Sequence, residues 1–203
     1  MNQGAGIYII TDIEADGPNP GRNSMLGFAS IALRRPFEIL GTFEATLEPL
    51  PDMAADPGTL AWLKSQAQAW DELTKSPKPA AKVMADYVNW LEGFEPPRTF
   101  VAHGLMFDGG WIDYYLDRFT AHRLISSPRA ANPLFYQGGI CLRSLAAGRL
   151  NRPMTQCNPN DYQAGWMGHI AHTHRAIDDA LGYAHLFDKL SPDLDGISSD
   201  LTE

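Results

Sequence analysis

The sequence predicts an α/β fold: a single domain built on one mixed five-stranded sheet flanked by helices. Three observations lead to this prediction. Three strand-like segments come first, and then helical and strand-like segments alternate until a helix ends the pattern. A length of 203 residues suits one sizeable domain with its own core and is short for two. The content of 44% hydrophobic and 20% charged residues is that of a soluble globular protein rather than a disordered one.

The first three segments have the patterns of strands. Residues 7–12 open with a short apolar run, which is typical of a central strand buried on both faces. The Gly- and Pro-rich residues 17–21 end this strand, and residues 25–33 follow as a second strand. Residues 37–47 alternate between apolar and polar, which predicts a half-exposed strand, antiparallel to its predecessor, at a sheet edge. The apolar positions of this alternation are Phe37, Ile39, Phe43, Ala45 and Leu47.

The middle of the chain begins with its least regular region. Residues 51–79 contain only small helical patches, and Pro79 suits the first turn of the helix that follows. That helix carries an apolar stripe from Val83 to Leu91. Residues 100–102 then form a short strand, and residues 111–119 have the spacing of an amphipathic helix.

The last part of the chain supplies the fifth strand and the final helix. We expect a strand near Ile140, a helix over residues 142–150 and an irregular loop over residues 151–168. The stripe from Ile177 to Phe187 predicts the last helix, which Ser191-Pro192 ends.

The sequence also favours a cytoplasmic setting. No apolar run approaches the ~20 residues of a membrane helix, and the apolar residues 7–10 are too few for a signal peptide and lack a basic flank. Cys141 and Cys157 match no metal-ligand spacing and make no disulfide framework, so we expect a reducing environment.

Asp12 and Glu14 lie two residues apart at the carboxyl end of the first predicted strand. Because side chains alternate along a strand, both carboxylates project from the same face, at the end of the sheet where ligands bind. Two neighbouring carboxylates repel each other unless a cation lies between them, and oxygen ligands suit Mg²⁺ or Mn²⁺. Such a pair also occurs by chance, so a solvated strand end is the alternative.

Two further acidic motifs follow. Asp108 comes after a short strand, a loop and Phe107, at the start of a helix. It has an alternative role as an acid in the first helical turn, and the two roles are compatible. His174 precedes the adjacent acids Asp178 and Asp179 at the start of the last helix. Neighbours on a helix point about 100° apart, so only one of the two acids can enter a given site. A histidine at such a place is often structural, and we interpret His172 as a solvated or supporting group.

In this order and context, the motifs Asp12-Ile13-Glu14, Phe107-Asp108 and His174-x-Ala176-x-x-Asp179 resemble those of the DEDDh exonuclease superfamily. That group includes ribonuclease T, oligoribonuclease and the proofreading subunit of bacterial replicative polymerases. A histidine at position 174, where the sister branch carries tyrosine, indicates the histidine branch. The resemblance covers roughly residues 7–190. It implies a ribonuclease H-like fold, with an exonuclease domain over residues 1–192 and a polar C-terminal tail over residues 193–203.

The resemblance further implies a 3′–5′ exonuclease that uses two divalent cations, Mg²⁺ or Mn²⁺. One cation would bind Asp12, Glu14 and Asp179, and the second would bind Asp12 together with Asp108. His174 would act as general base, and the products would be nucleoside 5′-monophosphates. The partners would be single-stranded nucleic acid or short oligonucleotide 3′ ends. The resemblance leaves a homodimer open.

The formal net charge of −8 is unusual for a protein that handles nucleic acid. Two divalent cations would bring it to −4 and would attract phosphate locally. The acidic balance therefore favours short or single-stranded substrates over long duplexes.

The sequence departs from the family pattern in two places. Gly104 follows His103, where relatives often carry asparagine, which leaves substrate preference open. Ala15-Asp16-Gly17 follows Glu14 in place of a threonine-containing turn, and we interpret Asp16 as a turn-stabilising acid.

Candidate substrate contacts are inferred less directly. Gly17 would let a terminal nucleotide approach the backbone. A second group of residues could stack against bases or could belong to the core instead: Met25, Leu26, His103 and Phe107. Four arginines are candidate phosphate contacts: Arg22, Arg143, Arg152 and Arg175. The five tryptophans, at 62, 70, 90, 111 and 166, are interpreted mainly as core or interface residues, with base stacking as the alternative for one of them.

Alternatives remain at this stage. A catalytically silent exonuclease fold could serve as a nucleic-acid or protein interaction module, although such a descendant would be expected to have lost an acid or the histidine. Another ribonuclease H-like hydrolase would share the clustered acids without the His174–Asp179 signature. The sequence does not decide whether the substrate is DNA, RNA or both, and it does not decide the length of the substrate.

Overall fold

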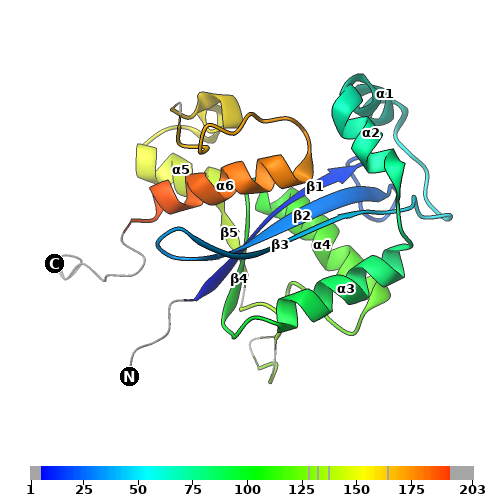
Figure 1. Ribbon diagram of the computed structural model, residues 1–203, viewed down its shortest axis with the longest axis horizontal. Coiled ribbons are helices and arrows are strands. Elements are labelled where there is room, and N and C mark those ends of the chain that lie inside the picture. Colours follow the sequence, from blue (N-terminus) through cyan, green and yellow to red (C-terminus); the bar gives the residue numbers. More distant parts are fainter. Residues whose placement is uncertain (1–5, 128, 132, 137, 164, 193–203) are drawn as a thin grey trace.

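The computed structural model describes residues 6–192, apart from residues 128, 132, 137 and 164. One five-stranded sheet, in the order β3-β2-β1-β4-β5, lies between helices on its two faces (Figure 1). Strands β1, β4 and β5 are parallel, while β2 is antiparallel to both β1 and β3. The strands are β1 (Ile7–Ala15), β2 (Met25–Arg34), β3 (Glu38–Thr46), β4 (Arg98–Ala102) and β5 (Ile140–Cys141). The predicted mixed α/β sheet of five strands is confirmed.

Six α-helices accompany the sheet within the described residues. They are α1 (Pro57–Ser65), α2 (Ala67–Lys75), α3 (Ala80–Glu92), α4 (Leu105–Phe119), α5 (Leu142–Leu150) and α6 (Ala176–Leu190). Helices α3 and α4 cover one face, α5 and α6 cover the other, and α1 and α2 lie beyond one end of β1 and β2 (Figure 1). The loop predicted for residues 151–168 contains two short 3₁₀ turns, η1 (Met154–Gln156) and η2 (Pro159–Asp161).

Strand β1 is central because its side chains feed both layers of the core. Ile9 belongs to the cluster that packs under α3 and α4, while Ile10 belongs to the cluster that packs under α5 and α6. Successive side chains of a strand point to opposite faces, so an uninterrupted apolar run suits a strand covered on both sides. This packing holds the carboxyl end of β1 rigidly at one end of the sheet.

Strand β3 forms the sheet edge as predicted, but the expectation for Ile39 is wrong. The register between β2 and β3 shifts, with Ala32 opposite Gly41 and Leu33 opposite Ile39. This bulge accommodates Leu40 as an extra residue, and Leu40 packs against the core cluster. Ile39 is therefore turned to the other side and is 41% exposed.

The small helical patches expected in residues 51–79 are α1 and α2. Asp56 caps α1, because its carboxylate accepts a hydrogen bond from the backbone N–H of Thr59 at 2.8 Å. Leu63 of α1 and Leu73 of α2 pack with Leu26 of β2 in a small cluster of their own. That cluster attaches the helical pair to the sheet.

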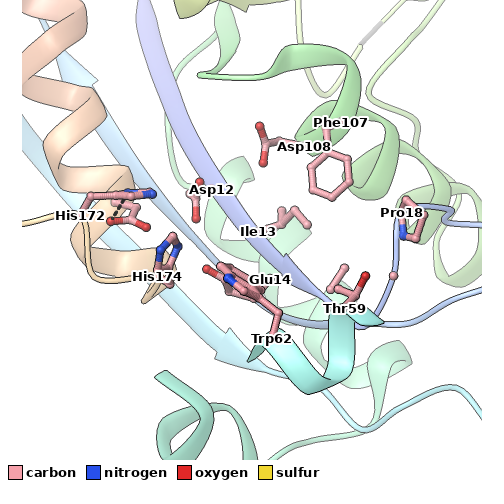
Figure 2. Close-up of a pocket in the computed structure, with 13 residues that line it drawn as sticks. Asp12, Ile13, Glu14, Pro18, Thr59, Trp62, Phe107, Asp108, His172 and His174 are labelled. Carbon is pink, nitrogen blue, oxygen red and sulfur yellow. Dashed lines mark ion pairs between the residues drawn. The ribbon is translucent and has the colours of Figure 1, made fainter. Parts of the chain in front are cut away.

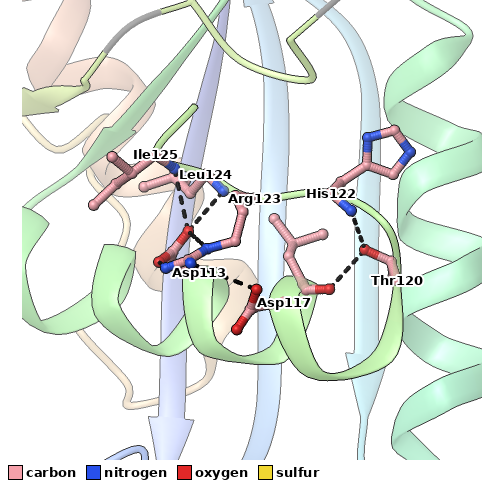
Figure 3. Close-up of polar contacts among 8 residues, drawn as sticks. Asp113, Asp117, Thr120, His122, Arg123, Leu124 and Ile125 are labelled. Atoms are coloured by element: carbon pink, nitrogen blue, oxygen red, sulfur yellow. Dashed lines mark hydrogen bonds and ion pairs between the residues drawn. The ribbon is translucent and has the colours of Figure 1, made fainter. Parts of the chain in front are cut away.

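Two buried polar contacts fix α4. The hydroxyl of Tyr115 accepts a hydrogen bond from the backbone N–H of Met25 at 2.8 Å, which joins α4 to β2. Farther along the helix, Asp113 pairs with Arg123 and accepts hydrogen bonds from the backbone N–H groups of Leu124 and Ile125 at 2.9 and 3.1 Å (Figure 3). The second contact folds the segment after α4 back along the helix.

The chain after α6 follows the prediction as far as the structure describes it. The helix ends at Leu190, directly before Ser191-Pro192. The tail predicted for residues 193–203 lies outside the described residues, so the boundary of the domain at residue 192 stays a prediction. Among the described helices, none has both the length and the apolar character required to traverse a bilayer.

Candidate active site

One pocket collects the motif residues at the end of the sheet where β1 stops. We call it the acidic pocket; its volume is about 300 Å³. It is bounded by β1, the start of α4, the loop before α6 and one side of α1 (Figure 2). It is lined by Asp12, Ile13, Glu14, Ala15, Gly17, Pro18, Thr59, Trp62, Phe107, Asp108, His172, His174 and Asp179.

Three carboxylates converge in this pocket from two elements. Asp12 and Glu14 extend from β1, and Asp179 extends from the first turn of α6. One carboxylate oxygen from each lies within 4.8 Å of the other two. Asp179 is only 1% exposed, whereas Asp178 accepts hydrogen bonds from Thr173 and Arg175 outside the cluster. The structure therefore brings Asp179, and not its neighbour, to Asp12 and Glu14.

Asp108 adds a fourth carboxylate from the first turn of α4. It is buried, and its Oδ2 accepts a hydrogen bond from the backbone N–H of Gly104 at 3.2 Å. This contact supports the start of the helix, as expected of a first-turn acid. Figure 2 shows that Asp108 lies on the opposite side of Asp12 from His172. The structural and the metal-binding interpretations of Asp108 are thus compatible.

Burial, and for Asp12 and Glu14 also mutual repulsion, destabilises the charged form of the pocket's carboxylates. Burial raises the pKa of Asp12 well above its usual range, and the three neighbouring carboxylates act in the same direction. Burial, followed by the charges of Asp179 and Asp108, raises the pKa of Glu14 to about 8. Burial also raises the pKa of Asp108 to about 7, although backbone hydrogen bonds, that of Gly104 first, oppose the shift.

These shifts and the donor chemistry fit divalent cations. Desolvation and repulsion both disfavour the charged carboxylates, and a cation among their oxygens would offset both effects. Hard carboxylate oxygens are the donors that Mg²⁺ and Mn²⁺ prefer. Asp12, Glu14 and Asp179 are grouped closely enough to bind one ion together, and Asp108 lines the same pocket outside that group.

His174 forms the wall of the pocket beside Trp62. The two rings meet edge to face, with their centroids 4.9 Å apart. Burial, followed by the nearby His172, lowers the pKa of His174, and Asp179 opposes this only in part. The neutral imidazole, which has a free electron pair, is therefore favoured.

His172 lies closer to the acids than the sequence suggested. Its Nδ1 is 2.9 Å from Oδ1 of Asp179, and its ring centroid is 4.4 Å from that of His174. The same Asp179 oxygen accepts a hydrogen bond from the backbone N–H of Thr173 at 3.1 Å. The contact between His172 and Asp179 agrees with the interpretation of His172 as a supporting group. It contradicts the alternative of a fully solvated side chain.

The four predicted substrate contacts separate into two groups. Gly17 and Phe107 line the acidic pocket, and Phe107 is 46% exposed. Met25 and His103 do not line it. Met25 is fully buried in the core, and Nε2 of His103 makes a 2.8 Å hydrogen bond with the hydroxyl of Tyr162.

Gly17 has a packing role that its motif did not reveal. A Cβ atom at this position would lie 2.3 Å from the side chain of Asn23, so only glycine fits without displacing that residue. Asn23 in turn donates a hydrogen bond to the carbonyl of Ala54 at 2.7 Å, which links the turn after β1 to the segment before α1. Asp16 stabilises the same turn, because it accepts a hydrogen bond from the backbone N–H of Ser24 at 2.6 Å.

The remaining candidates are not among the described residues that line the acidic pocket, although the charge of Arg143 reaches Asp108. Leu26 is buried with the helical pair α1 and α2. None of the arginines proposed as phosphate contacts is among the described residues that line the pocket. Arg175 instead pairs with Asp178, with 3.3 Å between nitrogen and oxygen.

The interpretation of the tryptophans as mainly core residues is wrong for Trp62, which lines the acidic pocket. Trp62 is 45% exposed and belongs to α1, whereas the next residue, Leu63, is buried. Adjacent helical positions point about 100° apart, so one can enter the core while the other faces the pocket. The sequence of α1 already separates Trp62 from Leu63 by one helical position. Only the position of α1 in the fold shows that Trp62 faces the acidic pocket.

The comparisons with known proteins support the fold. No family model and no curated protein matches the sequence. Among solved structures, the nuclease domain of 3′hExo, a DEDDh family member bound to rAMP, superposes with a TM-score of 0.66 at 14% identity, and the match covers 95% of each chain. E. coli Exonuclease I in complex with a dT13 oligonucleotide has a TM-score of 0.61 at 17% identity over 93% of this chain and 42% of that one. Cell-death related nuclease 4 has a TM-score of 0.60 at 16% identity over 91% of this chain and 63% of that one. With its sheet order, its flanking helices and these neighbours, the chain has the ribonuclease H-like fold of the DEDDh exonucleases.

Proposed function

We propose that this chain is a metal-dependent 3′–5′ exonuclease that hydrolyses single-stranded DNA or RNA to nucleoside 5′-monophosphates. The observation that carries the proposal is the convergence of Asp12, Glu14, Asp108 and Asp179, beside His174, in one pocket. These residues come from three segments far apart in the sequence, and the fold that assembles them is that of known 3′-exonucleases.

The carboxylates would hold two divalent cations. Asp12, Glu14 and Asp179 would bind one, and Asp12 with Asp108 would bind the other. Bound cations supply two effects in such sites: they make water more acidic, and they stabilise charge on the leaving oxygen. The acidic side chains would fix the positions of the cations, because each side chain is held by a strand or by the first turn of a helix.

His174 would accept the proton of the attacking water. Its lowered pKa keeps the imidazole neutral near physiological pH, which is the form that can take a proton. Asp179 lies near it and would stabilise the imidazolium that forms.

The shape of the pocket supports a terminal nucleotide as the bound group. A volume of about 300 Å³ is at the lower end for ligand pockets. The exposed aromatic side chains Trp62 and Phe107 both line it and could pack against a base or a sugar. Neighbouring structures hold rAMP or the single-stranded oligonucleotide dT13, which agrees with a substrate of this kind.

The test is digestion of matched single-stranded RNA and DNA labelled at the 5′ end, with Mg²⁺ or Mn²⁺. We expect a ladder that shortens from the 3′ end and is abolished by EDTA, by Asp12→Ala and by His174→Ala. Asp178→Ala is the matched control, because Asp178 is the adjacent acid outside the cluster; it should retain most activity. Binding of these oligonucleotides without cleavage under either metal would favour the silent interaction module instead.

A further inference from the structure

Two histidines and one acid form a second cluster on the wall of the acidic pocket. His172 and His174 come from the loop before α6, and Asp179 comes from the helix itself. One ligand atom of each lies within 4.8 Å of the other two. Only Asp179 is shared with the group of carboxylates.

His172 has no role in the proposed hydrolysis and an unusual environment. Its Nδ1 is buried and has no hydrogen-bond partner among the described residues, although Oδ1 of Asp179 is only 2.9 Å away. The two atoms are close, but their directions do not suit a hydrogen bond. A buried polar atom left in this state is costly. A cation bound between the nitrogen and the oxygen would give both atoms a partner.

We propose that His172, His174 and Asp179 form a binding site for a transition-metal ion, zinc first among them, that is distinct from the carboxylate site for Mg²⁺ or Mn²⁺. Zinc accepts two imidazoles and a carboxylate as ligands, with water at the fourth position. Imidazole ligands favour zinc over magnesium and manganese. The Mg²⁺ or Mn²⁺ proposed for hydrolysis would therefore compete poorly with zinc for this cluster.

The geometry requires only local adjustment. With metal–ligand distances of about 2.0–2.2 Å, the ligand atoms of a tetrahedral site lie about 3.4 Å apart. The three atoms already lie within 4.8 Å of one another, and both imidazoles are on a loop and partly exposed. The separations between the three ligand atoms therefore need to change by no more than about 1.4 Å.

Zinc at this cluster would inhibit the enzyme, an expectation that rests on the proposed function. His174 would give its free electron pair to the metal and could no longer accept a proton. Asp179 would be drawn away from the carboxylate site that it shares with Asp12 and Glu14. Inhibition would be reversed by a chelator selective for zinc over magnesium.

The binding test does not depend on nuclease activity. In the double variant Asp12→Asn/Glu14→Gln, which removes the carboxylate site, we expect calorimetry to show one zinc ion bound per chain. Adding His172→Ala should weaken zinc binding at least about tenfold, since loss of even a supporting group costs about 10–100-fold in metal affinity. His122→Ala, at a histidine that follows the C-terminal end of α4, should leave it unchanged. Unchanged zinc affinity in both His172→Ala and the more conservative His172→Gln would overturn the proposal.

The inhibition test uses the chain with its carboxylates intact. Zinc is titrated into the Mg²⁺-supported reaction, and each rate is expressed relative to the same protein without zinc. We expect His172→Ala to need at least about ten times more zinc for half inhibition, in line with the loss of affinity. Equal sensitivity of both proteins would refute the inhibitory role. If Mg²⁺ supports no hydrolysis at all, the proposed function fails, while the binding test still decides the zinc site.

Discussion

Asp178 and Asp179 show how one step along a helix separates two roles. Both begin α6, but Asp179 is buried beside Asp12 and Glu14, whereas Asp178 accepts hydrogen bonds from Thr173 and Arg175. The composition of the motif does not distinguish them. The rotation of about 100° between neighbouring positions does, once the face of the helix that meets the sheet is known.

Replacing His174 by alanine should lower kcat by about 10²–10⁴-fold, the usual contribution of a positioned general base. KM should change little, because the carboxylates and the aromatic walls of the pocket remain. Steady-state kinetics on a single-stranded oligonucleotide provide the measurement, with Asp178→Asn as the control. A kcat within about threefold of the wild-type value would exclude His174 as the base.

Asp113→Asn should destabilise the fold by about 1–2 kcal/mol, mainly through hydrogen bonds made by a charged acceptor. The exposed part of the pair with Arg123, whose side chain is 49% exposed, contributes little of this. Chemical denaturation at pH 7 measures the difference. Asp117→Asn is the matched control, because Asp117 is 59% exposed and lies 3.5 Å from the same arginine. That variant should stay within about 0.5 kcal/mol of wild type.

The effect of Asp113 should also depend on pH. Burial raises the pKa of Asp113, but hydrogen bonds from Arg123 and from the backbone of Ile125 and Leu124 outweigh it and hold the pKa below its ordinary value. A carboxyl with a depressed folded pKa stabilises above its unfolded pKa of about 3.9 and loses this contribution as the pH falls through the folded value. The stability gap between wild type and Asp113→Asn should therefore narrow below about pH 4. A gap that is constant down to pH 2.5 would contradict this account.

At the scale of elements, α1 connects a structural and a functional surface. Leu63 packs with Leu26 and Leu73, while Trp62 faces the acidic pocket from the same helix. Gly17 and Asn23 hold the turn after β1 against the segment that leads into α1. A short helix in the least regular part of the sequence is thus fixed well enough to form one wall of the site.

Trp62→Ala should raise KM about tenfold if the indole packs against a base, since such stacking contributes about 1–3 kcal/mol per base. Trp62→Phe should retain most of the affinity, because it keeps an aromatic face. Both variants should unfold at nearly the same temperature as wild type, since Trp62 is 45% exposed. An unchanged KM for the alanine variant would remove Trp62 from the substrate site.

Strand β3 shows where a sequence pattern fails at this scale. The alternation of residues 37–47 correctly predicts an edge strand, yet Ile39 is on the exposed side because the bulge accommodates Leu40. A bulge depends on the strand opposite, so one strand's own pattern does not reveal it.

At the scale of the whole molecule, folding brings like charges together. Asp12, Asp108 and Asp179 are far apart in the chain, yet they meet beyond one end of the sheet. Burial raises the pKa values of Asp12, Glu14 and Asp108, and for Asp12 and Glu14 the neighbouring carboxylates raise them further. The fold keeps a destabilised group of acids that a cation would stabilise.

Mg²⁺ or Mn²⁺ should therefore raise the unfolding temperature of the wild-type protein. An ion at 100 times its dissociation constant stabilises the folded state by about 2.7 kcal/mol. Differential scanning calorimetry with increasing metal measures the shift, and EDTA should reverse it. Asp12→Asn/Glu14→Gln should show little metal dependence. If millimolar Mn²⁺ leaves the unfolding temperature of the wild-type protein unchanged, the result would count against the metal site.

The sequence by itself determined the order of strands and helices, the mixed sheet, and the residues that carry the motifs. Hydrophobic periodicity predicts strands and helices, and the alternation of side chains along β1 puts Asp12 and Glu14 on one face. Both patterns depend only on residues that are neighbours in the chain, so the sequence is enough to reveal them. Tertiary structure alone decided that Trp62 and His172 line the acidic pocket, while Met25 and His103 are buried and do not line it. The physical reason is that each of these placements depends on which distant segment packs against the residue, and the local pattern carries no record of that partner.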